Sequence, residues 1–159
     1  MTEIRVSIAD YAVARGGTRL ITVGLGSCVA IALHAKAHGA GGLAHVMLPH
    51  AALSSDTSSP GKFASTAVPH MLAQLEALGV HGGLEARLVG GASMFAQLLP
   101  SGAVPLGARN VSAARAACAA AGIPIVAEDT GGGHGRSVYF DVAEGRVRVR
   151  SVACGDVEL

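Results

Sequence analysis

Hydrophobic and polar residues alternate along several short stretches of this chain, the two-residue period of a strand with one buried face. In residues 28–34 the pattern places Val29, Ile31 and Leu33 on one face and small residues on the other. The sequence predicts strands at residues 4–8, 19–23, 28–34, 43–48, 84–89, 123–127, 137–141 and 146–152. Glycine-containing turns at residues 39–42 and 144–145 predict two antiparallel hairpins. Residues 123–127 have the character of a buried strand.

Two longer stretches have the spacing of helices. In residues 64–78, apolar residues recur every three or four positions, and Gly79 predicts the end of the helix. Pro69 requires either a position in the first turn or a kink. A second predicted helix begins near Asn110, as its N-cap, and continues through an alanine-rich stretch to Gly122.

Strands outnumber helices in this pattern, and few connections are of the crossover type. The prediction is an α+β fold: a strand-rich, largely antiparallel central sheet with about two packed helices. Residues 51–61 are rich in Ser, Pro and Gly and predict an exposed loop. The 159 residues suffice for one domain, residues 1–159, with a core that needs neither disulfides nor metal.

Composition narrows the possible partners. The net charge is +1 without a basic stripe, so we expect no nucleic-acid binding. No apolar run approaches the ~20 residues that cross a bilayer, and the N-terminus lacks the apolar segment of a signal peptide, so we expect no membrane insertion. The three cysteines have no CxxC spacing, which is typical of reduced thiols and predicts a cytoplasmic protein.

One stretch of the chain suggests chemistry. Cys28 follows a turn that contains Gly26 and Ser27, and His45 lies one predicted strand further on. A thiol needs a neighbouring imidazole to act as a nucleophile at neutral pH, and Thr22 is near enough in the chain to orient that imidazole. Glycines in the turn allow a tight backbone, whose N–H groups at Ser27 and Gly26 can hold an oxyanion.

Simpler interpretations of the same residues remain open. A lone cysteine such as Cys28 is usually a small buried hydrophobe, His45 a hydrogen-bonded core histidine and Thr22 an ordinary strand residue. Cys118 and Cys154 are interpreted as structural or incidental. The seven histidines match no zinc spacing, and the glycines lack the rest of a nucleotide-binding motif. We therefore expect neither a metal nor a cofactor.

Several blocks of this sequence resemble the chemoreceptor glutamine deamidases, the CheD family of bacterial chemotaxis. Two blocks are specific: Thr22-Val23-Gly24-Leu25-Gly26-Ser27-Cys28-Val29-Ala30 and Gly42-Leu43-Ala44-His45-Val46-Met47-Leu48-Pro49. Residues 88–92, 107–110, 122–129, 131–132 and 135–136 also match the order of that family's blocks. The chain departs from the family pattern at residues 61–66 and 133–134, which affects specificity and leaves the three candidate positions intact.

The resemblance implies a protein-glutamine deamidase, which converts chemoreceptor glutamines to glutamate through a thioester. It implies that Cys28 is the nucleophile, His45 the general acid and base, and Thr22 the residue that orients His45. It also implies a fold similar to that of bacterial deamidase toxins. The implied partners are the cytoplasmic helices of methyl-accepting chemotaxis receptors and a CheC-type phosphatase.

A non-catalytic adaptor that binds the phosphatase or the receptor is the alternative function, and transglutamination is a third possibility. Gly90, Gly91, Arg109 and Asn110 are candidates for the rim of the site.

Overall fold

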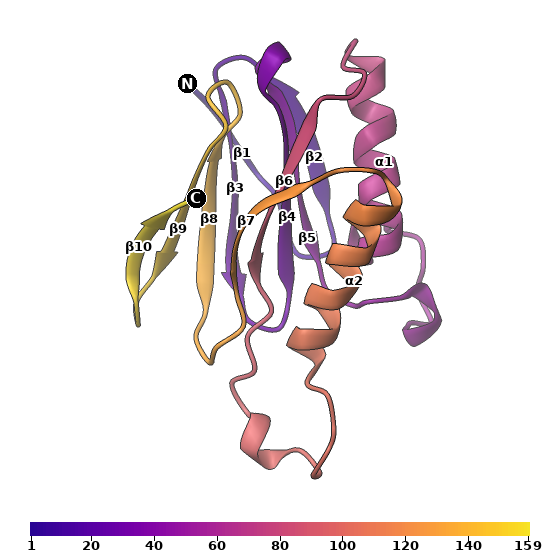
Figure 1. Ribbon diagram of the computed structural model, residues 1–159, viewed down its shortest axis with the longest axis vertical. Helices are drawn as coiled ribbons and strands as arrows, with labels where there is room; N and C mark the ends of the chain where they lie inside the picture. Colours follow the sequence, from indigo (N-terminus) through magenta and orange to yellow (C-terminus); the bar gives the residue numbers. More distant parts are fainter.

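The computed structural model describes the whole chain, residues 1–159. Its ten strands form two five-stranded sheets, and Figure 1 shows three layers: the first sheet, the second sheet and a helical layer. The first sheet has the order β1 (Thr2–Arg5), β3 (Thr18–Leu25), β8 (Arg136–Asp141), β9 (Arg146–Ser151) and β10 (Gly155–Glu158). The second has the order β2 (Tyr11–Arg15), β5 (Ala40–Val46), β4 (Val29–Ala35), β6 (Leu84–Gly90) and β7 (Ile125–Thr130). The helices are α1 (Ala64–Ala77) and α2 (Leu106–Ala120).

The predicted α+β class is confirmed. Antiparallel pairing dominates, since only β1–β3 and β6–β7 are parallel pairs. Both predicted hairpins form, as β4–β5 and β8–β9. The predicted turn at residues 39–42 is wrong, because the connection is made by residues 36–39 and β5 covers Ala40–Val46 instead of residues 43–48. Gly41 and Gly42 lie within the strand, where side chains of the two cores leave no room for a Cβ. The strands divide between two sheets because the chain passes directly from β3 in the first sheet to β4 in the second. Similarity to the deamidase-toxin fold stays a prediction.

Four of the strands that differ from prediction lie at sheet edges. β1 covers Thr2–Arg5 and is exposed on both faces, where a half-buried strand at residues 4–8 was expected. β7 begins at Ile125 and is mostly half-buried, so the prediction of a buried strand at residues 123–127 is wrong. β2 and β10 were not predicted. An edge strand pairs on one side only, and its hydrophobic pattern is correspondingly weak.

The two helices confirm one prediction and correct another. α1 ends close to Gly79, whose φ of +85° suits a residue without a side chain. Pro69 lies in the second turn of α1 on an exposed position, and the helix continues through it. α2 begins at Leu106, so the prediction that Asn110 is its N-cap is wrong, because Asn110 lies within the helix and is fully buried. No helix of this chain has the length and apolar character that spanning a bilayer requires.

Apolar side chains pack on both faces of the second sheet. The core between this sheet and the helices includes Val29, Ile31, Leu33, Val46, Met71, Leu75, Leu88, Val111 and Cys118. The core between the two sheets includes Leu20, Leu25, Cys28, Ala30, Ala32, Leu43, Val138, Phe140 and Val147. The predicted division of residues 28–34 into two faces is thus confirmed: the large side chains face the helices and the small ones face the first sheet.

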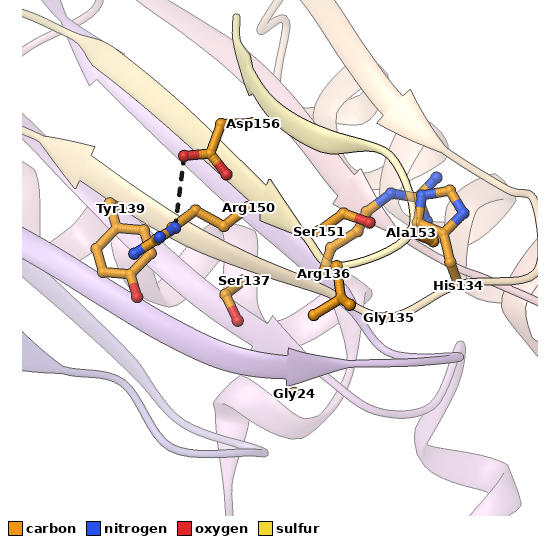
Figure 2. Close-up of a pocket in the computed structure, with 11 residues that line it drawn as sticks. Gly24, His134, Gly135, Arg136, Ser137, Tyr139, Arg150, Ser151, Ala153 and Asp156 are labelled. Carbon is orange, nitrogen blue, oxygen red and sulfur yellow. Dashed lines mark ion pairs between the residues drawn. The ribbon is translucent and has the colours of Figure 1, made fainter.

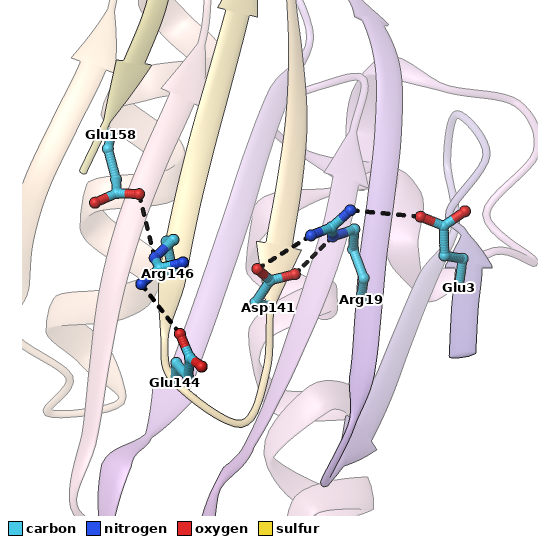
Figure 3. A network of polar contacts seen from close by, with 6 residues as sticks. All are labelled: Glu3, Arg19, Asp141, Glu144, Arg146 and Glu158. Carbon is cyan, nitrogen blue, oxygen red and sulfur yellow. Dashed lines mark hydrogen bonds and ion pairs between the residues drawn. The ribbon is translucent and has the colours of Figure 1, made fainter. Parts of the chain in front are cut away.

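Ion pairs link neighbouring strands on the outer face of the first sheet (Figure 3). Arg19 on β3 lies between Asp141 on β8, with Nε 2.6 Å from Oδ1, and Glu3 on β1, with Nη1 3.6 Å from Oε2. Arg146 on β9 contacts Glu144 in the β8–β9 turn and Glu158 on β10, each at 3.2 Å. The exposed pairs of Arg146 contribute about 0–1 kcal/mol each, so the stability of the fold comes mainly from the two cores.

Gly41 on β5 is a sensitive point of the core between the sheets. An added Cβ would collide with the Leu33 carbonyl oxygen and lie 2.9 Å from Phe140 Cζ. We expect Gly41→Ala to reduce the free energy of unfolding by at least about 2 kcal/mol, measured by urea denaturation. Gly17→Ala is the matched control, because nothing lies within 4 Å of its added Cβ. Equal stability of the two variants would contradict this account of the packing.

Candidate active site

Thr22 and His45 meet across the space between the two sheets. The Thr22 hydroxyl on β3 lies 2.6 Å from Nδ1 of His45 on β5 and 2.7 Å from the carbonyl oxygen of Val6. A carbonyl oxygen only accepts, so the single hydroxyl proton goes to Val6, and the hydroxyl accepts a hydrogen bond from Nδ1–H of His45. His45 then carries its proton on Nδ1 and keeps a lone pair on Nε2.

The segment between β1 and β2 covers this pair. The N–H of Ala9 donates to the His45 carbonyl at 2.9 Å, and the His45 N–H donates to the Asp10 carbonyl at 3.0 Å. Ala9 is the one non-glycine residue with a positive φ, +65°, a conformation that alanine adopts only at a cost. Thr22 and His45 are consequently buried, with 1% and 2% of their surfaces exposed.

Cys28 lies on the same face of the second sheet as His45. Ala30 on β4 is paired with His45 on β5, and Cys28, two residues before Ala30, has the same orientation by strand alternation. Diagonal neighbours of this kind have Cα atoms about 7–8 Å apart. Nε2 of His45 has no hydrogen-bond partner, and no hydrogen bond joins it to the Cys28 thiol. The base is thus near the thiol but not yet in contact with it.

In the turn before β4 the carbonyl groups are hydrogen-bonded, whereas the N–H groups are not bonded to other residues. Gly26, Ser27 and Cys28 lie between β3 and β4, and none of their N–H groups donates a hydrogen bond to another residue. Their carbonyl oxygens all accept one: from Ala92 N–H at 2.9 Å, from Asn110 Nδ2 at 2.8 Å and from Gly91 N–H at 2.8 Å, in that order. Successive N–H groups that are left without acceptors in a turn are able to bind an anion.

Burial keeps the thiol and the imidazole neutral. It raises the pKa of the Cys28 thiol, an effect opposed by the residue's own N–H, and it lowers the pKa of His45. In each case the charged form is disfavoured because it loses water. At neutral pH the resting site therefore holds a thiol beside a neutral imidazole, which is able to accept a proton.

The rate at which iodoacetamide alkylates Cys28 is expected to rise with pH, with a midpoint above that of a free cysteine. The reason is the raised pKa, since only the thiolate attacks quickly. Peptide mass spectrometry after timed labelling gives the rate at each pH. A midpoint at or below neutrality would instead indicate a thiolate–imidazolium pair in the resting protein and contradict this electrostatic description.

Asn110 belongs to this region, but not in either role that the sequence interpretation gave it. It was considered for the rim of the site and as a helix cap, but its amide Nδ2 donates to the carbonyls of Ser27, at 2.8 Å, and Met47, at 3.1 Å. Among the other rim candidates, Gly90 and Gly91 are buried with positive φ, and Arg109 is exposed. The available signal was Pro105, which favours a helix start several residues before Asn110.

Two hollows flank the turn. The larger, about 670 Å³, has Gly24, Arg136 and Tyr139 in its lining, which includes none of Thr22, Cys28 and His45. Figure 2 shows that its lining includes the ion pair of Arg150 and Asp156. The smaller, about 240 Å³, is mainly apolar and is lined in part by Ser27. Of these two hollows, the smaller one therefore borders the turn before β4.

The β6–α2 loop forms the other wall of the smaller hollow. It projects beyond the body of the molecule (Figure 1, bottom). Its exposed apolar side chains are Met94, Phe95, Leu98, Leu99 and Val104. We call these five residues the apolar loop. Met94, Phe95 and Leu99 line the smaller hollow together with Ser27.

The remaining cysteines and histidines form no further centre. Cys118 is fully buried in α2, where burial raises the pKa of its thiol to about 11, in agreement with a structural role. Cys154 is exposed, with Sγ 3.9 Å from Nδ1 of His134. No group of three or more His, Cys, Asp or Glu side chains is arranged to hold a metal ion.

Known proteins resemble this chain along nearly its full length. The family described as CheD chemotactic sensory transduction matches residues 47–151. A protein named probable chemoreceptor glutamine deamidase CheD from Clostridium kluyveri is 46% identical over 158 residues, covering 99% of this chain and 98% of the relative. Proteins of the same name from Clostridium novyi and Desulforamulus reducens are 45% and 42% identical, covering 96% and 94% of this chain and 95% and 91% of the relatives.

Proposed function

This chain belongs to the CheD family, and from that premise we propose that residues 1–159 act as a single deamidase domain that converts glutamines of chemoreceptors to glutamate. The names of the relatives support the reaction. One observation carries the assignment to residues: the Thr22–His45 contact leaves the Nε2 lone pair on the face of the sheet where Cys28 lies. That arrangement supplies a nucleophile with its base.

In the first step the Cys28 sulfur attacks the carboxamide carbon of the substrate glutamine. A carbon–sulfur bond forms, the thiol proton passes to Nε2 of His45, and the carbonyl oxygen becomes an oxyanion. The free N–H groups of Gly26, Ser27 and Cys28 supply donors for that oxyanion. Because the resting thiol and imidazole are neutral, proton transfer accompanies the attack. Catalytic contacts commonly tighten when the substrate binds, which brings the thiol within reach of Nε2.

In the second step the intermediate loses ammonia. The His45 imidazolium returns its proton to the departing amino group, the carbon–nitrogen bond breaks, and a γ-glutamyl thioester remains on Cys28. Water then attacks the thioester and His45 again accepts a proton. The carbon–sulfur bond breaks, His45 returns that proton to the Cys28 sulfur, and glutamate is released. Throughout, Thr22 accepts the Nδ1–H hydrogen bond and so keeps Nε2 free for each transfer.

The surface beside Ser27 suits a large protein substrate. The apolar loop offers hydrophobic contact area next to the nucleophile turn, and we propose that it contacts the cytoplasmic helices of the receptor. The protein accordingly acts in the cytoplasm. The CheC-type phosphatase is proposed as a second partner, for which the same exposed loop is the candidate surface.

The test is mass spectrometry of a chemoreceptor cytoplasmic fragment incubated with the protein. Deamidation replaces NH₂ with OH and adds about one mass unit, or about three in ¹⁸O-labelled water, because water supplies the new oxygen. An amine adduct would show transglutamination. Binding of the fragment or of the phosphatase with unchanged glutamines would favour the adaptor. A fragment without enzyme, incubated equally long, corrects for spontaneous deamidation.

A further inference from the structure

Asn110 controls the orientation of the peptide that joins Ser27 to Cys28, and we propose that it is a positioning residue for the oxyanion donors of this site. The inference rests on the proposed role of Cys28 as nucleophile. Asn110 touches neither the thiol nor the imidazole, and its effect is exerted through the backbone that it holds.

The argument begins with the planar trans peptide. All peptide bonds of this chain are trans, so the carbonyl of Ser27 and the N–H of Cys28 point in opposite directions. Asn110 Nδ2 donates to the Ser27 carbonyl at 2.8 Å and holds it toward α2. The N–H of Cys28 consequently points away from α2, where it lies close enough to the Cys28 sulfur to favour the thiolate.

The second hydrogen bond of Asn110 connects the turn to the strand that carries the base. The same Nδ2 donates to the carbonyl of Met47 at 3.1 Å, two residues beyond His45. Each of the two amide protons thus has a backbone acceptor, one in the segment of the nucleophile and one in the segment of the base. Asn110 therefore fixes both the direction of the oxyanion donor and the spacing between the two segments.

The surroundings of Asn110 fix the direction in which its amide points. Its side chain is fully buried, and Oδ1 has no hydrogen-bond partner. An apolar residue at this position would leave the carbonyls of Ser27 and Met47 without the donor that Asn110 supplies, which is unfavourable for buried acceptors. The orientation of the amide is fixed, because both neighbours of Nδ2 are carbonyl oxygens that accept only.

Two reactions of Cys28 separate this role from a general effect on the thiol. Acylation by p-nitrophenyl acetate forms a carbon–sulfur bond, expels p-nitrophenolate and passes through an oxyanion, and the thiol proton is released to solvent. Alkylation by iodoacetamide expels iodide from a saturated carbon without forming an oxyanion. The ratio of the two rates therefore reports stabilisation of the oxyanion independently of thiol pKa and access. Neither reaction needs a receptor.

We expect Asn110→Asp, which keeps the shape but loses both donors, to reduce the acylation-to-alkylation ratio about 100-fold. Asn110→Ala introduces no charge and serves if the aspartate variant does not fold. Cys118→Ala is the matched control, since it is equally buried in α2 but does not contact the turn, and Cys28→Ala gives the background. An acylation-to-alkylation ratio that neither Asn110 variant changes would overturn the inference, even where both rates fall in parallel.

The same measurements keep this inference apart from the proposed function. If the ratio falls in the Asn110 variants while the wild-type protein converts no receptor glutamine, the positioning role stands and the deamidase assignment fails. If the wild-type protein converts glutamine and the ratio does not change, the deamidase assignment stands and Asn110 is only structural.

Discussion

Replacing Cys28 with alanine is expected to reduce the rate of glutamine conversion in a chemoreceptor fragment on the order of 10⁴-fold or more. A carboxamide is a weak electrophile with a poor leaving group, so its hydrolysis here depends on a covalent intermediate that alanine cannot form. Binding of the receptor fragment is expected to persist, because the apolar loop is unchanged. The measurement is the initial rate of glutamate formation, from peptide mass spectrometry over time.

Cys118→Ala and Cys154→Ala are the matched controls for this loss. One removes a buried thiol from α2 and the other an exposed thiol near the C-terminus. Both are expected to convert glutamine at near wild-type rates after correction for the folded fraction. Substantial turnover by the Cys28 variant would show that the nucleophile lies elsewhere, and the assignment of His45 and Thr22 would fail with it.

The strands at the centre of the second sheet were predictable from the sequence because β4 and β5 are buried on both faces, although β5 begins three residues earlier than expected. In β4 the alternation of large and small residues separates two cores, and both of its neighbours, β5 and β6, were predicted. The edge strands β1, β2, β7 and β10 were displaced or missed, because a partly exposed edge needs no strict hydrophobic pattern. The division of the strands into two sheets could not be predicted from local sequence patterns either, because it depends on the chain passing from the first sheet to the second after β3.

The candidate site shows the same limit. Residues close in sequence to a glycine turn, such as Cys28, were recognisable from local chemistry and from resemblance. The contact between Thr22 and His45 joins two sheets, and Val6, whose carbonyl determines the tautomer of His45, comes from a segment with no chemical signal. Asn110 was mistaken for a cap because asparagine favours helix starts, whereas its two acceptors lie 83 and 63 residues away in the chain.

Replacing His45 with glutamine is expected to slow conversion about 10²- to 10⁴-fold, the range for loss of a general acid and base. Since burial lowers the pKa of His45, the wild-type kcat/KM should decline only when the pH falls below about 6.5, as Nε2 becomes protonated. This acidic decline should disappear from the residual activity of the variant. Rates of glutamate formation between pH 4.5 and 8, with folding checked at each pH, provide the test.

A second buried histidine supplies the control for that experiment. His34 on β4 is 3% exposed, and burial lowers its pKa as well, yet it packs against Phe140 and makes no hydrogen bond with the candidate residues. His34→Gln is expected to lose stability but to keep the wild-type kcat and the acidic decline. If the His34 and His45 variants were equally slow, burial rather than proton transfer would explain the loss, and the base would have to be sought elsewhere.

The activity of Thr22→Val should fall between those of the His34 and His45 variants, about 10- to 100-fold below the wild type. Loss of the hydroxyl leaves Nδ1 of His45 buried without a partner and allows the proton to move to Nε2.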